Sequence, residues 1–307
     1  MFPDFSIKYS DMNTKNIDSR TWGILSVLIA GFSWGLMGIF VRALISLGFR
    51  PVDIAAMRAL GAALILGSSF GLFYRDAFKL KLRDIWCMAG CGIISIIFFN
   101  ICYFSAIQYT TVNIAVVLLY TSPAFVILMS SICFKEKITF RKMLSLTAVL
   151  AGCILVSGVF SSGGSLSPKV LLMGLGSAFF YALYTIFSRY AQIRKYSNAA
   201  ITLWTFLFAG CAGSFMLDWQ NAIRIAETGN WQLWTLLAGL ILIVTILPYY
   251  AYTAGLKRLT PSTSAIAATI EPAVGTLVGI LFFHEKMTCS AGIGMLLIIG
   301  AVLLCRE

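Results

Sequence analysis

The feature that most constrains this chain is a series of ten apolar runs, each about as long as a lipid bilayer is thick. A helix needs about twenty apolar residues to cross the hydrocarbon core of a membrane. The runs lie near 22–45, 52–73, 85–107, 112–134, 142–159, 169–189, 197–217, 231–256, 262–283 and 288–305. Because only helices and closed barrels satisfy every backbone hydrogen bond in lipid, the sequence predicts an all-α integral membrane protein with ten transmembrane helices.

The composition agrees with lipid surroundings. Of the 307 residues, 59% are hydrophobic and 11% are charged, whereas soluble domains carry about 25% charged residues. A net charge of +11 would suit nucleic acid, but the basic residues lie in short gaps between apolar runs, so we predict no nucleic-acid partner. The eight cysteines lie mostly inside apolar runs and the chain has one histidine, so we expect no disulfide, metal or cofactor.

The two halves of the chain repeat at a fixed offset of 149 residues. Ser-Pro-Ala at 122–124 recurs as Glu-Pro-Ala at 271–273, and Phe-Lys-Glu-Lys at 134–137 recurs as Phe-His-Glu-Lys at 283–286. An ungapped register held over about fifty residues indicates an internal duplication. The Ser- and Gly-rich segment 161–165 is expected to be the flexible linker between the two copies.

The basic residues indicate how the copies are oriented. Most of the 23 Lys and Arg residues share one side if the N-terminus is cytoplasmic, and the cytoplasmic side retains such residues. The gap 135–142 holds four basic residues, whereas its copy keeps only Lys286. Five helices per copy is an odd number, so the second copy must be inverted. We therefore predict two inverted five-helix repeats around a central cavity, with a midplane substrate site and both termini cytoplasmic.

These features resemble the EamA family of the drug/metabolite transporter superfamily. The resemblance rests on the paired Pro-Ala motifs followed by Phe-x-Glu-Lys, on Trp-Gly at 34–35, and on Ala-Ala-Met-Arg at 55–58. It covers about 22–305. It implies a ten-helix fold with a central cavity, and a bacterial inner-membrane exporter of small metabolites, often amino acids or related compounds. The corresponding organisation is a cytoplasmic tail at 1–21, a first EamA repeat at 22–159, a linker at 160–168 and a second repeat at 169–305.

Two prolines are predicted to kink their helices. Pro123 and Pro272 each remove a backbone donor and crowd the carbonyl four residues earlier, in the fourth and ninth runs. The kinks would shape the cavity and act as flex points during alternating access. A static bend tolerated by packing is the alternative interpretation.

Two ionisable residues at membrane depth are candidates for the substrate site. Glu271 lies near the middle of the ninth run, where a carboxylate is costly unless it is paired, hydrated or protonated. We expect it to face the cavity and either bind a substrate ammonium or carry a coupling proton; a structural hydrogen bond is the alternative. Arg58, about two turns into the second helix, could bind a substrate carboxylate, although we favour a structural or gating role.

Aromatic and amide side chains complete the predicted substrate site. They are Trp34, Asn100, Tyr103, Tyr181, Tyr184, Tyr249 and Tyr252, with Tyr120 at similar depth. A cavity with aromatic walls and few hydrogen-bonding groups suits small amphiphilic solutes. A single aromatic side chain at this depth more often packs in the protein core or faces lipid. The prediction of a substrate site therefore concerns these side chains as a set.

We therefore expect a secondary transporter that exports a small organic metabolite by alternating access, with proton coupling through Glu271 as one option. A flippase for lipids or lipid-linked solutes is the alternative. An intramembrane enzyme is disfavoured, because the chain has no Gly-x-x-x-x-Gly-Lys, His-Glu-x-x-His or acidic phosphate–metal motif. The expected partners are a small-molecule substrate and membrane lipids; the oligomeric state is open.

Overall fold

The computed structural model describes residues 17–159, 166–228 and 231–305, and in these ranges it contains helices and loops but no strand. Residues 1–16 of the predicted tail and 160–165 of the predicted linker lie outside the described residues. Helices are the expected structure in lipid, because each helix satisfies the hydrogen-bonding groups of its own backbone.

The helices follow the apolar runs closely. In the first half they are α1 (Ile17–Gly35), α2 (Met37–Ser46), α3 (Pro51–Phe73), η2 (Arg75–Phe78), η3 (Leu82–Asp84), α4 (Ile85–Ala89), η4 (Gly90–Phe98), α5 (Phe99–Tyr109), α6 (Val112–Leu119), α7 (Ser122–Phe134) and α8 (Phe140–Ser157). In the second half they are α9 (Pro168–Ile193), α10 (Asn198–Ser214), α11 (Trp219–Ala226), α12 (Trp231–Ile241), η6 (Leu242–Ile246), α13 (Leu247–Leu256), α14 (Pro261–Ala268), α15 (Glu271–Phe283) and α16 (Cys289–Leu304).

Eight helical segments of the described chain are long and apolar enough to cross a membrane. They are Ser19–Ser46, Pro51–Phe73, Leu82–Tyr109, Val112–Phe134, Phe140–Ser157, Pro168–Ile193, Trp231–Leu256 and Pro261–Phe283. The remaining two predicted runs also form helices, but shorter ones. The chain bends by 101° between α10 and α11, and α16 is an apolar helix of 16 residues.

The turn between α10 and α11 has a specific cause. Asp218 accepts a hydrogen bond from the backbone N–H of Asn221 (3.1 Å), which caps the new helix, and its own N–H donates to Asp53 Oδ1 (3.1 Å). Arg50 holds the same Asp53 carboxylate through two side-chain hydrogen bonds of 2.7 Å. The side-chain hydrogen bond to Asp53 also raises the pKa of Arg50. This polar cluster fastens the turn to the start of α3.

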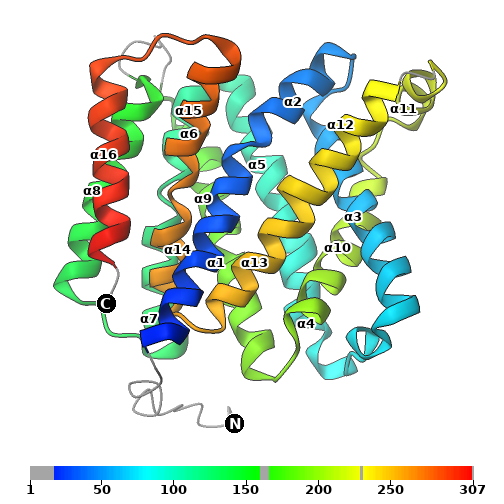
Figure 1. Ribbon diagram of the computed structural model, residues 1–307, viewed down its shortest axis with the longest axis horizontal. Helices are drawn as coiled ribbons and strands as arrows, with labels where there is room; N and C mark the ends of the chain where they lie inside the picture. The colour runs from blue at the N-terminus through cyan, green and yellow to red at the C-terminus, as the bar shows by residue number, and fades with distance from the viewer. Residues whose placement is uncertain (1–16, 160–165, 229–230, 306–307) are drawn as a thin grey trace.

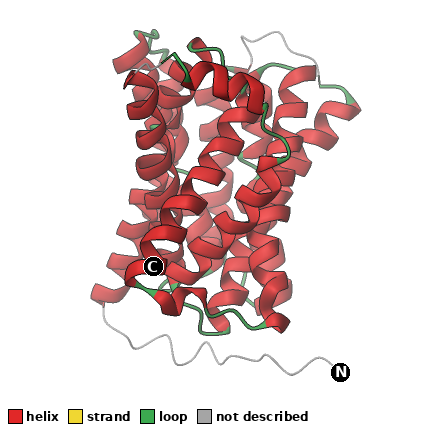
Figure 2. Cartoon of the chain, turned by 90° about the vertical axis from the view of Figure 1, so that its right-hand side faces the viewer, coloured by secondary structure: helices red, strands yellow, loops and turns green. Residues whose placement is uncertain are grey.

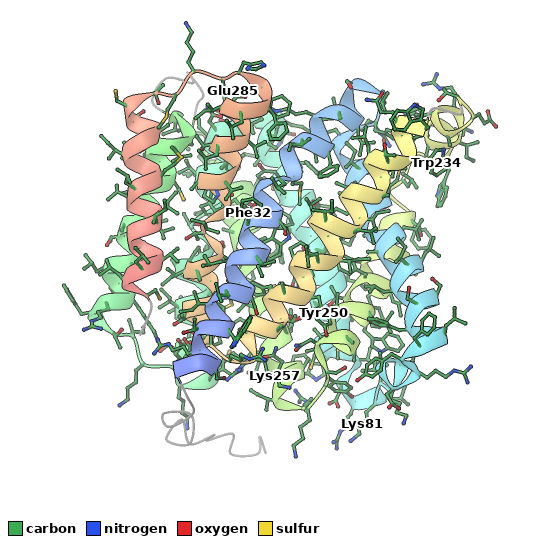
Figure 3. The ribbon with its side chains drawn as sticks, in the orientation of Figure 1. Phe32, Lys81, Trp234, Tyr250, Lys257 and Glu285 are labelled. Carbon is green, nitrogen blue, oxygen red and sulfur yellow. The ribbon has the colours of Figure 1, made fainter. Side chains whose placement is uncertain are left out.

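The helices form one bundle in which α8 and α16 pair at one edge (Figure 1). A view turned by 90° shows the helices running roughly parallel (Figure 2). The described chain begins and ends at the same end of the bundle, where Lys81 and Lys257 also lie; Trp234 and Glu285 lie at the other end (Figure 3). The α7–α8 loop shares a cavity with Arg20 and Cys305, so it lies at the end where the described chain begins and ends. The α15–α16 loop, which contains Glu285, lies at the opposite end.

Helix ends recur at the offset of 149 residues found in the sequence. Thr111 caps α6 and Thr260 caps α14, each accepting a hydrogen bond from the backbone N–H three residues later. Lys135 ends α7 and His284 ends α15, both in the left-handed conformation with φ of 53° and 52°. A left-handed residue of this kind is a common helix terminator, so equivalent positions in the two halves start and stop helices alike.

Both prolines lie at helix breaks rather than at mid-helix kinks. α6 ends at Leu119, and Pro123 follows in the first turn of α7; α14 ends before Pro272, which lies in the first turn of α15. A proline is tolerated in the first turn because the missing N–H would have no helical partner there. At the breaks, backbone hydrogen bonds to the carbonyl three residues earlier, such as Thr121 N to Leu118 O (3.1 Å), keep the backbone groups satisfied. The crowding predicted from sequence therefore interrupts the helix instead of bending it.

Two π-helical segments, η4 and η6, lie within the helical segments Leu82–Tyr109 and Trp231–Leu256. In this wider helix the hydrogen-bond step is five residues. Ser95 Oγ donates to Gly90 O (2.9 Å) and Thr245 Oγ1 donates to Leu240 O (2.7 Å), each five residues back. These hydroxyl groups thus donate hydrogen bonds to buried backbone carbonyl oxygens. Such segments are frequent at functional sites, and η4 carries residues that line the central cavity.

Candidate functional site

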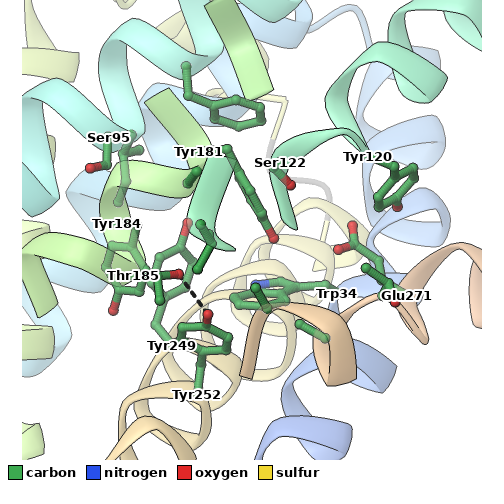
Figure 4. Close-up of a pocket in the computed structure, with 17 residues that line it drawn as sticks. Trp34, Ser95, Tyr120, Ser122, Tyr181, Tyr184, Thr185, Tyr249, Tyr252 and Glu271 are labelled. Atoms are coloured by element: carbon green, nitrogen blue, oxygen red, sulfur yellow. Dashed lines mark hydrogen bonds between the residues drawn. The ribbon is translucent and has the colours of Figure 1, made fainter. Parts of the chain in front are cut away.

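A central cavity of about 30 Å³ lies where helices from both halves meet (Figure 4). Its lining comes from α1, η4, α5, α7, α9, α13, α14 and α15, and from the breaks between α6 and α7 and between α14 and α15. The lining residues are Trp34, Ser95, Ile96, Phe99, Tyr120, Ser122, Val126, Tyr181, Ala182, Tyr184, Thr185, Tyr249, Tyr252, Ala265, Ala268, Thr269 and Glu271. One water needs about 10–15 Å³ of such space, so the cavity holds about two waters.

Glu271 is the one carboxylate in this lining. It is the first residue of α15 and comes directly after the break that follows α14. The start of a helix favours negative charge because its N–H groups and macrodipole point there. The Tyr120 hydroxyl lies beside the Glu271 carboxylate (Figure 4), and Tyr120 immediately follows α6 at the matching break of the first half. The two helix breaks thus bring a carboxylate and a phenol together at membrane depth.

Close contact between α1 and α15 places Trp34 against this carboxylate. A Cβ atom on Gly35 would lie 2.6 Å from Val274 Cβ and 2.9 Å from the Glu271 carbonyl oxygen. Only glycine permits this approach, because the carbonyl belongs to the backbone and cannot move aside alone. The adjacent residue, Trp34, consequently enters the cavity between Glu271 on one side and Tyr249 on the other (Figure 4).

An aromatic cluster forms the wall opposite Glu271. The Trp34 ring lies 5.4 Å from the ring of Tyr249, 5.7 Å from that of Tyr252 and 6.5 Å from that of Tyr181, measured between centroids. Tyr184 meets Tyr249 edge-to-face at 5.0 Å. Edge-to-face and tilted arrangements at these distances are favourable for aromatic pairs. The cluster is therefore a packed wall that presents ring faces and a few hydroxyl groups to the cavity.

One hydrogen bond inside the wall joins α9 to α13. Thr185 Oγ1 and Tyr252 Oη lie 2.7 Å apart, and both side chains are buried (Figure 4). A buried hydroxyl without a partner is costly, so this pair fixes the orientation of the Tyr252 ring.

Ion pairs fasten the bundle at both ends. At the Glu285 end, Arg42 Nη1 lies 2.8 Å from Glu285 Oε1, with both side chains about half exposed. At the other end, Arg194 Nε lies 2.8 Å from Asp84 Oδ1, and Tyr196 donates a hydrogen bond to Asp84 Oδ2 (2.9 Å). Burial raises the pKa of the Tyr196 phenol. The central cavity is thus enclosed between two fastened ends.

Most of the predicted site residues line the cavity: Trp34, Tyr181, Tyr184, Tyr249, Tyr252 and Glu271. Three do not. Arg58 is buried and its Nη1 donates to Met37 Sδ (3.4 Å), although its charge still acts on Glu271 through space. Asn100 donates to Ile96 O (2.7 Å) of the preceding turn, and Tyr103 stacks on Phe99 at 5.7 Å. None of these three side chains is among the lining residues, although Arg58 and Tyr103 contact residues that are, Tyr249 and Phe99.

The sequence reasoning missed several small polar residues of the lining. The sequence pattern does not single out Ser95, Thr185 or Thr269, and it marks Ser122 only as the counterpart of Glu271. Thr185 could have been found, because residues three and four apart share a helix face and both Tyr181 and Tyr184 were already candidates. No comparable pattern identifies Ser95, which lies in a π-helical segment with altered spacing.

Comparison with known proteins gives a consistent family match. The model of a family described as the EamA-like transporter family matches residues 21–158 and 168–306. An uncharacterized transporter of Archaeoglobus fulgidus is 29% identical over 66% of this chain and 70% of that protein. The uncharacterized inner membrane transporter YicL of Salmonella typhimurium is 25% identical over 92% of this chain and 94% of that protein.

Similarity to a solved structure supports the fold alone. One crystal structure superposes with a TM-score of 0.73 and covers 92% of this chain and 96% of its own chain, at 16% sequence identity.

Among the relatives by sequence, the uncharacterized transporter YwfM of Bacillus subtilis is 25% identical over 91% of this chain and 92% of that protein.

Proposed function

This chain belongs to the EamA-like transporter family, and we propose that it is a secondary transporter that exports small organic metabolites, such as amino acids or related amphiphilic compounds, by alternating access. It is an integral membrane protein, as its apolar helices and transporter relatives indicate. The proposed location is a bacterial inner membrane, with both termini in the cytoplasm.

The proposed topology has ten spans in two inverted repeats, 22–159 and 169–305, joined by a linker at 160–168. Helices at all ten apolar runs support it. So does the placement of the α7–α8 and α15–α16 loops, which correspond in sequence but lie at opposite ends of the bundle. α10 and α16, with 17 and 16 residues, are about 24–26 Å long at 1.5 Å per residue. Flanking residues and local bilayer thinning can accommodate such short spans.

The small size of the cavity supports alternating access. Sites that hold drug-sized ligands measure about 300–1,000 Å³, whereas this cavity measures about 30 Å³. A metabolite can therefore enter only after the surrounding helices move. The breaks before Pro123 and Pro272 divide two spans into separately movable helices at cavity level, and the Arg42–Glu285 and Arg194–Asp84 pairs must part in turn as each end opens.

The single observation that carries the proposal is the placement of Glu271, a carboxylate at a helix break that faces the central aromatic cavity beside Tyr120. We assign Glu271 the change of charge that drives the cycle, through uptake of a coupling proton or through a substrate ammonium. The Trp34, Tyr181, Tyr184, Tyr249 and Tyr252 rings would bind the apolar part of the solute. Arg58, Asn100 and Tyr103 would support this wall from behind.

The test is transport by Glu271→Gln in proteoliposomes. A thermal-shift screen against amino acids, sugars and nucleosides selects the solute, because a bound ligand raises apparent stability. We expect Glu271→Gln to reduce pH-gradient-driven flux at least tenfold. If Glu271→Gln keeps solute exchange in the absence of a pH gradient, the role of Glu271 is to carry the coupling proton. If the variant loses both activities, the role of Glu271 is to bind a substrate ammonium. The control is Glu227→Gln, which removes an exposed carboxylate directly after the end of α11. Unchanged, equally pH-dependent flux in Glu271→Gln would refute the role.

A further inference from the structure

A second cavity, of about 290 Å³, lies at the end of the bundle that carries Arg20 and Cys305. It is about ten times larger than the central cavity. The start of α1, the α7–α8 loop, the start of α14 and the end of α16 surround it, so both halves of the chain contribute. We call it the basic cavity.

Charge distinguishes this cavity from the central one. Five basic side chains line it: Arg20, Lys135, Lys137, Arg141 and Lys142. The one acidic side chain in the lining is Glu136, which is buried and lies 2.7 Å from Lys142 Nζ. Five positive groups and one negative group leave a net charge of +4 around one cavity. Like charges held together repel one another unless an anion neutralises them.

The starts of two helices add to this positive field. Thr139 caps α8 by accepting a hydrogen bond from Lys142 N, and Thr260 caps α14 by accepting one from Thr263 N. All four of these residues line the cavity. Helix starts favour anions because their N–H groups and dipoles point outward. The helix dipoles of α8 and α14 and the basic side chains therefore act on the same cavity.

The equivalent loop of the second half has no such cluster. There Glu285 pairs with Arg42 from α2 (2.8 Å), and Lys286 is the one lysine in the loop. A role in membrane orientation requires only the number of basic residues in a loop. It does not require them to converge on a cavity, so their convergence calls for a ligand.

We propose that the basic cavity binds an anionic phosphate group, carried by a phospholipid headgroup or present as free phosphate. Basic pockets between transmembrane helices are suited to anionic headgroups. Lys135 and Lys137 are exposed at the rim and would reach the phosphate oxygens, while Lys142 is held by Glu136.

A phosphate at this position would connect the two halves. The Glu136 carboxylate accepts from the backbone N–H of Ser262 (3.4 Å), and the hydroxyls of Ser130 and Ser262 lie 3.0 Å apart. The α7–α8 loop is thereby attached to α14, the helix that ends at the break beside Glu271. A bound phosphate would strengthen this attachment and stabilise the bundle with this end closed.

The experiment measures lipid binding to the purified full chain by native mass spectrometry in neutral detergent. The probes are dioleoylphosphatidylglycerol, dioleoylphosphatidylcholine and sodium phosphate. The variant Lys135→Gln/Lys137→Gln should bind phosphatidylglycerol about thirtyfold more weakly than the unaltered chain. Lys135→Arg/Lys137→Arg keeps the charge and should keep the binding. The control Lys81→Gln/Lys257→Gln removes the same charge from exposed positions at the same end, outside the cavity, and should change binding less than threefold.

Sodium phosphate identifies the source of the ligand. Displacement of phosphatidylglycerol by millimolar phosphate would assign the site to the phosphate group itself, and a lack of displacement would assign it to the intact anionic lipid. Equal affinity for phosphatidylcholine and phosphatidylglycerol would overturn the proposal. So would equal weakening of binding in the two Gln double variants.

Discussion

Replacing Gly294 by alanine should loosen the pair of helices at the edge of the bundle. Gly294 of α16 faces Gly152 of α8. An added Cβ atom would lie 2.7 Å from the Gly152 carbonyl oxygen and 2.9 Å from the backbone nitrogen of Val156. Carbon atoms pack at about 3.5–4.0 Å. Because both obstacles are backbone atoms of α8, no side chain can rotate away, and the two helices must separate.

The expected cost follows from this geometry. Inserting a methyl group into a closely packed interface costs about 1–3 kcal/mol, against about 0.5–1 kcal/mol gained because alanine favours a helix more than glycine does. Gly294→Ala should therefore lower the free energy of unfolding by about 1–2 kcal/mol. Gly300 is the matched control on the same helix: nothing lies within 4 Å of its Cβ position, so Gly300→Ala should leave stability unchanged or raise it.

The assay is reversible unfolding of the purified protein in mixed detergent micelles, titrated with sodium dodecyl sulfate and followed by circular dichroism at the helical band. Both variants add one methyl group to α16. The difference in their free energies of unfolding therefore isolates the effect of the contact with α8. The reasoning would be refuted if Gly294→Ala were as stable as Gly300→Ala.

Two further predictions concern the wall and the topology. Thr185→Val and Tyr252→Phe should each lower the free energy of unfolding by about 1–3 kcal/mol, because each leaves a buried hydroxyl unpaired. The double variant should lose less than the sum; additive losses in the same titration would contradict a direct bond. Cysteines introduced as Ile138→Cys and Met287→Cys, both at exposed positions, should react with a membrane-impermeant maleimide from opposite sides of the bilayer. Labelling from one side would refute the inverted repeat.

The candidate site was predictable in part. Glu271 and the tyrosines stand out because polar groups are rare in apolar runs, and Glu271, Tyr181, Tyr184, Tyr249 and Tyr252 do line the cavity. Arg58 stands out in the same way, yet it is not among the residues that line the cavity. Membrane depth can be read from position in a run, but the direction of a side chain depends on how its helix is rotated. A helix that is apolar on all sides has no polar stripe to reveal that rotation.

The helical architecture follows from the amino-acid sequence alone, because run length and the need to satisfy the backbone in lipid are local requirements. So do the corresponding helix ends of the two halves, since caps such as Thr111 and Thr260 act on neighbouring backbone groups. The contact between Glu271 and Tyr120, and the cavity that Arg20, Lys135 and Lys142 surround, arise from the packing of the helices and cannot be read from the sequence. These residues lie far apart in the chain, and the close packing of backbones at glycines such as Gly35 sets how their helices come together.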